Sequence, residues 1–150
     1  MGLIVQKFGG TSVASAERIL NVAQRVKAET DRGNQVVVVV SAMGKSTDQL
    51  VNLAKEISKQ PNKRDMDMLL STGEQVTISL LSMALNEQNL PAVSFTGWQA
   101  GIVTEPVHGN ARITTINTEA VKNQLADGKV VIVAGFQGIT ENGEITTLGR

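Results

Sequence analysis

Short apolar runs alternate with helical stripes of apolar residues along the chain. The runs cover residues 3–5, 35–42, 92–96 and 129–134. The valine-rich run at 35–42 is too short for a typical helix, and it is typical of a strand buried on both faces of a parallel sheet. We interpret 3–5 and 129–134 as further buried strands. Residues 92–96 predict another strand, the third in order along the chain.

Helical periodicity occupies the segments between these runs. One stripe, ended by Gly33, has the i, i+3, i+4, i+7 spacing of a helix face and consists of Ile19, Val22, Ala23 and Val26. A second stripe, which Thr47 or Asp48 is placed to cap, consists of Leu50, Leu53, Ala54 and Ile57. Residues 64–86 predict a long helix with Gly73 as a point of weakness. Its second half is apolar on most sides, so we expect it to be buried in the domain or at a subunit contact.

The alternation of strands and helices predicts an α/β fold, a three-layer αβα sandwich with a mostly parallel sheet. Near the end of the chain the pattern changes, because Asn142-Gly143 lies between two short β-like runs and predicts a hairpin. The 150 residues contain no internal repeat and no linker, so we expect one domain or part of one.

Charge and composition narrow the classes of function. Fourteen Lys and Arg balance fourteen Asp and Glu, which argues against a nucleic-acid partner and against an anionic membrane surface. The longest unbroken aliphatic run, residues 36–40, is far shorter than the roughly 20 residues that span a bilayer. With no cysteine and a single histidine, a Cys- or His-based metal site is not expected. A soluble cytoplasmic protein is the default interpretation.

The first strand is followed by a glycine turn with a lysine at its entrance. Lys7, Gly9 and Gly10 suit a polyanion, because glycines let backbone N–H groups approach phosphate oxygens and lysine supplies a cation. A plain strand-to-helix connection is the alternative, since the turn matches neither a Walker A loop nor a dinucleotide fingerprint. In parallel sheets, ligands bind beyond the carboxyl ends of strands. Lys7, residues 41–47, Thr96 and residues 135–138 are all expected at that edge.

Glu74 is the most informative carboxylate of the sequence. Its neighbours at i±3 and i±4 in the predicted helix include no base, so no ion pair within the helix holds it. It is either a solvated surface residue or, if partly buried, a receptor for an ammonium group. We interpret Asp65 and Asp67 as first-turn charges that complement the helix dipole, and His108 as a loop imidazole.

Six groups of motifs stand in order along the whole chain. They are Lys7-Phe8-Gly9-Gly10-Thr11-Ser12, Val40-Ser41-Ala42-Met43-Gly44 with Thr47-Asp48, Leu70-Ser71-Thr72-Gly73-Glu74-Gln75, Thr96-Gly97-Trp98-Gln99-Ala100-Gly101, Ala134-Gly135-Phe136-Gln137-Gly138 and Thr146-Thr147-Leu148-Gly149-Arg150. Together they resemble the aspartate kinases of the amino-acid kinase superfamily. The resemblance implies ATP-dependent phosphorylation of the L-aspartate side-chain carboxylate to 4-phospho-L-aspartate, the first step toward lysine, threonine and methionine.

The resemblance also implies a role for each matching residue. Lys7 would be catalytic at the transferring phosphate, and the ATP phosphates would also meet Phe8, Gly9, Gly10 and Ser41. L-aspartate would be bound by Thr47, Glu74, Phe136 and Arg150. Of these, Glu74 would hold the ammonium group and Arg150 the α-carboxylate, a pairing that suits a zwitterion. Mg²⁺ would arrive on the nucleotide phosphates, with no metal ligand from the chain.

The family pattern continues after this arginine with a Gly-Gly-Ser-Asp segment, a nucleotide-binding half and ACT regulatory domains. We therefore expect residues 1–150 to be the N-terminal, amino-acid-binding part of an amino-acid kinase domain, inactive alone and part of an oligomer at full length. A non-catalytic aspartate-binding or assembly fragment is one alternative. A sister amino-acid kinase, such as an acetylglutamate kinase, is another.

Overall fold

The computed structural model describes residues 2–149, and within them the strands form two four-stranded sheets. Sheet A is parallel throughout, with strand order β1-β2-β6-β3. Its strands are β1 (Leu3–Phe8), β2 (Gln35–Val40), β6 (Val130–Ala134) and β3 (Ala92–Phe95). The buried strands predicted at 35–42 and 129–134 are confirmed at its centre, where every residue of β6 is buried.

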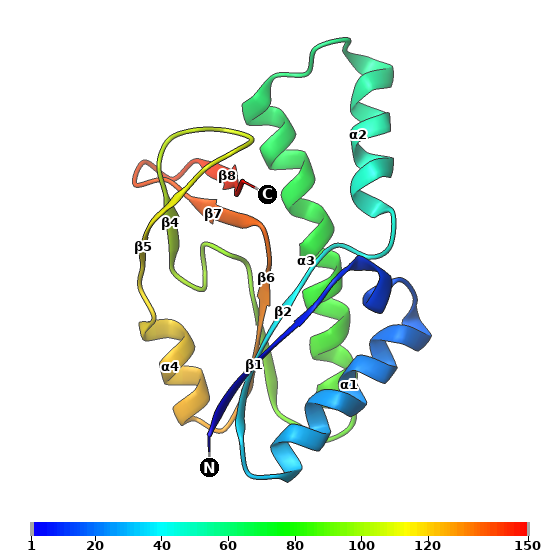
Figure 1. Cartoon of the computed structure of the whole chain (residues 1–150), viewed down its shortest axis with the longest axis vertical. Coiled ribbons are helices and arrows are strands. Elements are labelled where there is room, and N and C mark those ends of the chain that lie inside the picture. The colour runs from blue at the N-terminus through cyan, green and yellow to red at the C-terminus, as the bar shows by residue number, and fades with distance from the viewer. Residues whose placement is uncertain (1, 150) are drawn as a thin grey trace.

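Helices cover both faces of sheet A, which confirms the three-layer αβα arrangement. Figure 1 shows α1 (Ala16–Asp31) and α3 (Lys63–Glu87) on one side and α4 (Glu119–Ala126) on the other. The larger apolar core lies under α1 and α3, and it includes Val26, Leu81 and Ile132. The smaller core lies under α4, where Leu125 packs with Val131 and Val133.

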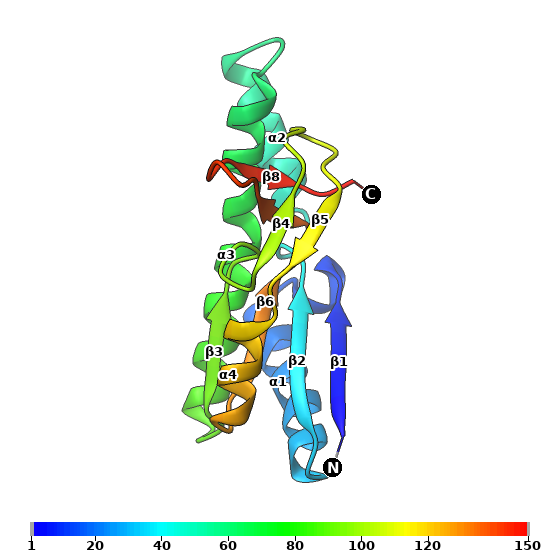
Figure 2. The same cartoon turned by 90° about the vertical axis from the view of Figure 1, so that its left-hand side faces the viewer.

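Sheet B lies at the carboxyl end of sheet A (Figure 2). Its strand order is β5-β4-β7-β8. Its strands are β5 (Ile113–Ile116), β4 (Ile102–Thr104), β7 (Gln137–Ile139) and β8 (Ile145–Thr147). The predicted hairpin is confirmed, because β7 and β8 pair antiparallel across a turn in which Gly143 has a φ of 84°. Sheet B therefore stands beyond the strand ends where ligands bind in parallel sheets.

Helix α1 follows its sequence signals closely. Ser15 accepts a hydrogen bond from the Arg18 amide as N-cap, and Gly33, at a φ of 87°, follows the helix end. The predicted apolar stripe is buried at all of its positions, Ile19, Val22, Ala23 and Val26. Glycine fits the turn because other residues rarely adopt a positive φ. The short 3₁₀ helix η1 (Gly10–Val13) separates α1 from the glycine turn.

Two sequence predictions were wrong: the burial of the first strand, and the cap that Thr47 or Asp48 was expected to give the second helix. Strand β1 is not buried but pairs within the described residues with β2 alone, so Leu3 and Val5 are 55% and 64% exposed. Helix α2 (Ser46–Ile57) has no buried residue, and Ile57 at the end of its stripe is 84% exposed. It begins at Ser46 with no side-chain cap, so Thr47 lies inside the first turn. Apolar spacing predicted the helix correctly but could not reveal how little covers it.

Helix α3 is the longest element and runs unbroken through Gly73, the point of weakness named from the sequence. Among residues 2–149 it is long and apolar enough, by length and composition only, to cross a membrane. The core helix of a soluble protein passes the same test. In this fold Ile78, Leu81 and Leu85 of α3 are buried in the core against sheet A. The apolar side chains on its other face, Val76, Leu80 and Met83, are 52%, 38% and 64% exposed, so the core accounts for only part of the apolar second half.

Candidate functional site

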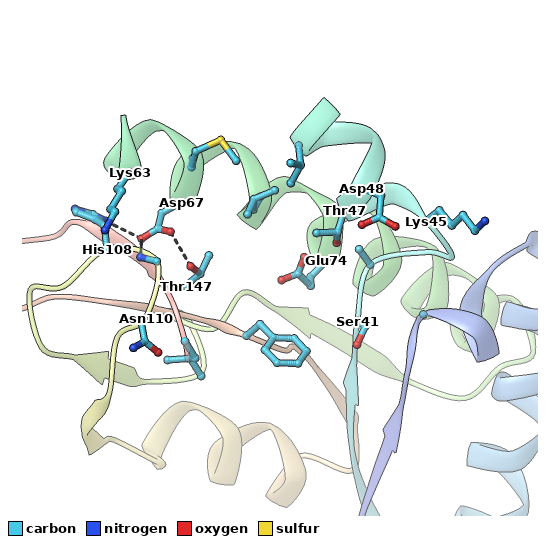
Figure 3. Close-up of a pocket in the computed structure, with 18 of the residues that line it drawn as sticks. Ser41, Lys45, Thr47, Asp48, Lys63, Asp67, Glu74, His108, Asn110 and Thr147 are labelled. Carbon is cyan, nitrogen blue, oxygen red and sulfur yellow. Dashed lines mark hydrogen bonds and ion pairs between the residues drawn. The ribbon is translucent and has the colours of Figure 1, made fainter. Parts of the chain in front are cut away.

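A cavity of about 1060 Å³ lies beyond the carboxyl ends of sheet A, among α2, α3 and sheet B (Figure 3). One part of its lining comes from the glycine turn and the loop after β2, and it includes Gly10, Ser41 and Gly44. Another part comes from α3 and includes Asp67 and Glu74. The cavity therefore brings together motifs that are far apart in the sequence, as expected for a ligand site of an α/β fold.

The glycine turn packs directly on the loop after β2. A β-carbon on Gly10 would stand 3.0 Å from the carbonyl oxygens of both Ala42 and Gly44, and the Gly44 amide donates to the Gly10 carbonyl at 2.9 Å. A side chain at position 10 would therefore push the two segments apart. At Gly9, by contrast, a β-carbon would meet no atom within 4 Å. That open space leaves room for a ligand to approach the backbone of Gly9 closely.

Lys7 lies beside this cavity, although it is not one of the residues that line it. The side chain is exposed at the end of β1, and its Nζ lies 5.1 Å from the centroid of the Phe136 ring, a cation–π contact. Phe136 does line the cavity. The sequence prediction that Lys7 and residues 135–138 meet at one sheet edge is thus confirmed, whereas Thr96 does not line the cavity.

Phe136 has an unusual backbone conformation for a residue that is not glycine. Its φ is 62°, in the left-handed region, and its carbonyl accepts a hydrogen bond from the Leu148 amide at 2.9 Å. Such conformations cost about 1–2 kcal/mol and persist where the surrounding structure enforces them, often at functional sites. The strained turn brings the ring of Phe136 to the cavity and attaches its backbone to the end of β8.

Glu74 is buried, with 6% of its surface exposed, and it lines the cavity (Figure 3). The structure therefore excludes the solvated-surface alternative. A carboxylate on a cavity wall is suited to bind a cationic group of a ligand, because a charge-assisted hydrogen bond is stronger than a neutral one. The ammonium role itself stays a prediction. Ser41 and Thr47 are half-buried and also line the cavity, whereas Arg150 lies outside the described residues.

The stretch of α3 around Glu74 is fixed by two contacts. A β-carbon on Gly73 would stand 2.9 Å from the Ala42 β-carbon, so the helix touches the end of β2. Gln137 is fully buried, and its Nε2 donates to the Ser71 carbonyl at 3.1 Å while its Oε1 accepts from the Gly97 amide at 3.0 Å. These contacts hold Glu74 at a set distance from the glycine turn and from β7.

Sequence reasoning missed a buried carboxylate two helical turns before Glu74. Asp67 is not a first-turn surface charge, since only 1% of its surface is exposed. Its Oδ2 accepts from His108 Nδ1 at 2.7 Å and from the Gly109 amide at 3.1 Å, and its Oδ1 accepts from Thr147 Oγ1 at 2.7 Å. With Asp67 ionised, Nδ1 carries the imidazole proton. The seven-residue spacing from Glu74 was the available signal, because it places both carboxylates on one helix face.

Charges of both signs line the cavity. Lys45 and Asp48 lie near the glycine turn, and Lys63 and His108 lie at the far end beside Asp67. Within residues 2–149 no group of three His, Cys, Asp or Glu side chains could hold a metal ion. The arrangement can bind a small zwitterion or an anion-bearing ligand through side chains and backbone amides.

The comparisons with known proteins agree on one family. The model of the amino acid kinase family matches residues 2–150. The aspartokinase of Bacillus sp. (strain MGA3) and aspartokinase 2 of Bacillus subtilis (strain 168) are each 73% identical over 150 residues. The crystal structure of aspartate kinase from Synechocystis is 54% identical, with a TM-score of 0.83 over 99% of this chain and 24% of that one.

The chain belongs to the amino acid kinase family. The two Bacillus aspartokinases match it over 100% of its length, whereas it spans only 36% and 37% of theirs. The fold is shared more widely, because E. coli aspartokinase III in complex with aspartate and ADP has a TM-score of 0.85 at 24% identity, covering 99% of this chain and 44% of that one. These matches confirm the family and the fold predicted from the sequence.

Proposed function

We propose that this chain forms the amino-acid-binding part of an aspartate kinase. The reaction transfers the γ-phosphoryl group of ATP to the side-chain carboxylate of L-aspartate and gives 4-phospho-L-aspartate and ADP. A carboxylate oxygen forms the new bond to phosphorus, and the bond between the γ-phosphorus and the bridging oxygen of ADP breaks. Support comes from the Bacillus aspartokinases at 73% identity and from the complex of E. coli aspartokinase III with aspartate and ADP.

The observation that carries the proposal is the buried Glu74 in a cavity that also contains the glycine turn. In the proposed pose Glu74 binds the substrate ammonium, Arg150 its α-carboxylate, and Thr47 and the Phe136 backbone support the molecule. The substrate's side-chain carboxylate then points toward Gly10. A zwitterion bound at both charged ends has one orientation, which is what an in-line transfer requires.

The phosphate end of the proposed pose is formed by the glycine turn. Backbone groups of Phe8, Gly9 and Gly10 with the Ser41 hydroxyl would bind phosphate oxygens, and Lys7 would stabilise charge on the transferring group. Phosphoryl transfer depends on positioning and positive charge more than on covalent chemistry. A mobile lysine beside an accessible glycine backbone is therefore suited to bind the phosphate groups. Mg²⁺, when bound to the nucleotide phosphates, neutralises part of their charge.

The chain spans about a third of the length of its curated relatives. We therefore assign kinase activity to the whole polypeptide and aspartate binding to residues 1–150. We expect residues 1–150 alone to bind aspartate without turnover. We further infer a cytoplasmic protein that forms an oligomer at full length. A sister kinase acting on acetylglutamate is disfavoured, because an acylated amine is neutral and would leave the buried Glu74 without a cationic substrate group.

Calorimetric titration with L-aspartate tests the proposal. We expect the unsubstituted chain to bind aspartate, and Glu74→Gln to weaken binding by about 100-fold because a charge-assisted contact is lost. Glu87→Gln, at an exposed position of the same helix, is the matched control and should leave binding unchanged. N-acetyl-L-glutamate should not bind. Trapping of acyl phosphate with hydroxylamine tests turnover, and formation by residues 1–150 alone would contradict our expectation of an inactive chain.

A further inference from the structure

The buried carboxylate of Asp67 connects three segments of the chain. It belongs to α3, and its hydrogen-bond donors are His108 and Gly109 in the loop after β4 and Thr147 in β8. Both carboxylate oxygens are used, and the side chain is almost completely shielded from solvent. Hydrogen bonds to a buried charged group are stronger than average, so this contact should fix the position of α3 relative to the loop and to β8.

The loop and β8 themselves form one unit. The Ala111 amide donates to the Thr147 carbonyl at 3.0 Å, and the Gly149 amide donates to the Ala111 carbonyl at 3.1 Å. The Leu148 amide donates a hydrogen bond to the Phe136 carbonyl. Any contact that holds Thr147 therefore also sets the position of the backbone of Phe136 and of the chain up to Gly149. Arg150 is the next residue in the sequence.

Asp67 and Glu74 lie seven residues apart on α3, which corresponds to about 10 Å along the helix axis and to the same helix face. Both line the cavity (Figure 3). Near Glu74 the helix is fixed to the end of β2 through Gly73 and Ala42. Near Asp67 it is fixed to β8. Together the two contacts determine how far the wall that carries Glu74 stands from the wall formed by Phe136 and Leu148.

We propose that Asp67 is a positioning residue for the amino-acid substrate. It sets the separation between Glu74, which receives the ammonium group, and the wall formed by Phe136 and Leu148. The inference rests on the proposed function, because it requires a ligand that is bound from both walls at once. Asp67 itself need not touch aspartate, since its oxygens already accept bonds from His108, Gly109 and Thr147.

The test is titration of variants of residues 1–150 with L-aspartate. Binding is measured by calorimetry and by the chemical shifts of backbone amides in NMR spectra. In Asp67→Asn the side-chain amide places its own N–H groups against the donors of His108, Gly109 or Thr147. We expect the Kd for aspartate to rise at least about tenfold, because a ligand held from two walls loses one of its contacts. The aspartate-induced shifts of the Leu148 and Gly149 amides should shrink with it. Asp65→Asn makes the same charge change at an exposed position two residues away and should bind within about twofold of the unsubstituted chain.

A second pair of variants keeps the test decisive if Asp67→Asn does not fold. Thr147→Val removes one donor to Asp67 and should weaken aspartate binding, whereas Thr147→Ser keeps the hydroxyl and should restore it. Folded Asp67→Asn or Thr147→Val chains that bind aspartate as tightly as the unsubstituted chain would overturn the inference. Absence of aspartate binding by the unsubstituted chain would overturn the proposed function, and the inference with it.

Discussion

Gly73 of α3 faces Ala42 at the end of β2 so closely that a β-carbon on the glycine would stand 2.9 Å from the alanine β-carbon. Real β-carbons do not approach this far, so the helix can lie where it does only because one partner lacks a side chain. The neighbouring residues on both sides, Glu74 and Ser41, line the cavity. The contact thus places a helix residue and a strand-end residue in the same site.

Exchanging the methyl group between these two positions tests the contact. Gly73→Ala should destabilise the fold by about 1–2 kcal/mol, since overpacking outweighs the roughly 1 kcal/mol gain in helix propensity. Adding Ala42→Gly to Gly73→Ala should recover most of the loss, because the second substitution removes the clash. Urea unfolding of the two single variants and the double variant measures the coupling. Purely additive effects would show that the helix is not held at this point.

The positive φ of Phe136 predicts an unusual order of stability. Both Phe136→Ala and Phe136→Gly remove the ring, so their difference reports the backbone alone. We expect the glycine variant to be more stable by about 1 kcal/mol, because glycine adopts a φ of 62° without strain. At Ser94 in β3, where the backbone is extended, the order should reverse. Thermal or urea unfolding measures both pairs, and an alanine variant at 136 that is as stable as the glycine variant would contradict the strained turn.

Two buried threonine hydroxyls join β4 to β8. Thr104 Oγ1 and Thr146 Oγ1 lie 2.7 Å apart, and both side chains are almost fully buried. Thr104→Val should cost about 1–2 kcal/mol because it leaves a buried hydroxyl at Thr146 without this partner. Substituting both residues by valine should lower the free energy of unfolding by less than the sum of the single changes, since no buried hydroxyl is then left without a hydrogen bond. The free energy of unfolding from urea titrations of all three variants checks this.

Lys7 should separate stability from activity. Its side chain is exposed and contacts the Phe136 ring, so Lys7→Met should change the free energy of unfolding by no more than about 1 kcal/mol. In a polypeptide that phosphorylates aspartate, the same change should reduce kcat by at least about 100-fold, because charge on the transferring phosphate loses its cation. Lys7→Arg, which retains the charge, is the control. An unaltered kcat in Lys7→Met would refute the catalytic role.

The parts of the fold that could be predicted from sequence are those with strong local periodicity. The stripe from Ile19 to Val26 is buried on one helix face, and the valine run of β2 is buried on both faces of sheet A. Period and composition were sufficient to predict both. The exposure of β1 could not be predicted, because an edge strand and a central strand can share the same composition. It depends on which strand comes to lie beside it.

At the site, sequence alone singled out Glu74 and the glycine turn and placed His108 in a loop, where it lies, but misjudged Asp67. Asp67 lies near the start of α3, where acidic residues usually face solvent and complement the helix dipole. The side chain is bonded to Thr147, 80 residues away in the sequence, and to His108 and Gly109, 41 and 42 residues away. A lone histidine in a loop has no periodicity to interpret. Contacts of this range follow from the topology of the chain, which local spacing does not contain.

The strand order of sheet A also has a consequence for synthesis of the chain. Strand β6 lies between β2 and β3, and β3 has no other neighbour in the sheet within residues 2–149. During translation, β2 and β3 therefore emerge from the ribosome long before the strand that joins them. At a synthesis rate of about 5–20 residues per second, their hydrogen-bonding edges and apolar faces stay uncovered for several seconds. In that interval β2 can pair with β1, but its other edge and both edges of β3 have no partner strand in sheet A. Chaperones bind surfaces of this kind, and the central layer can close only after residue 134 has left the exit tunnel.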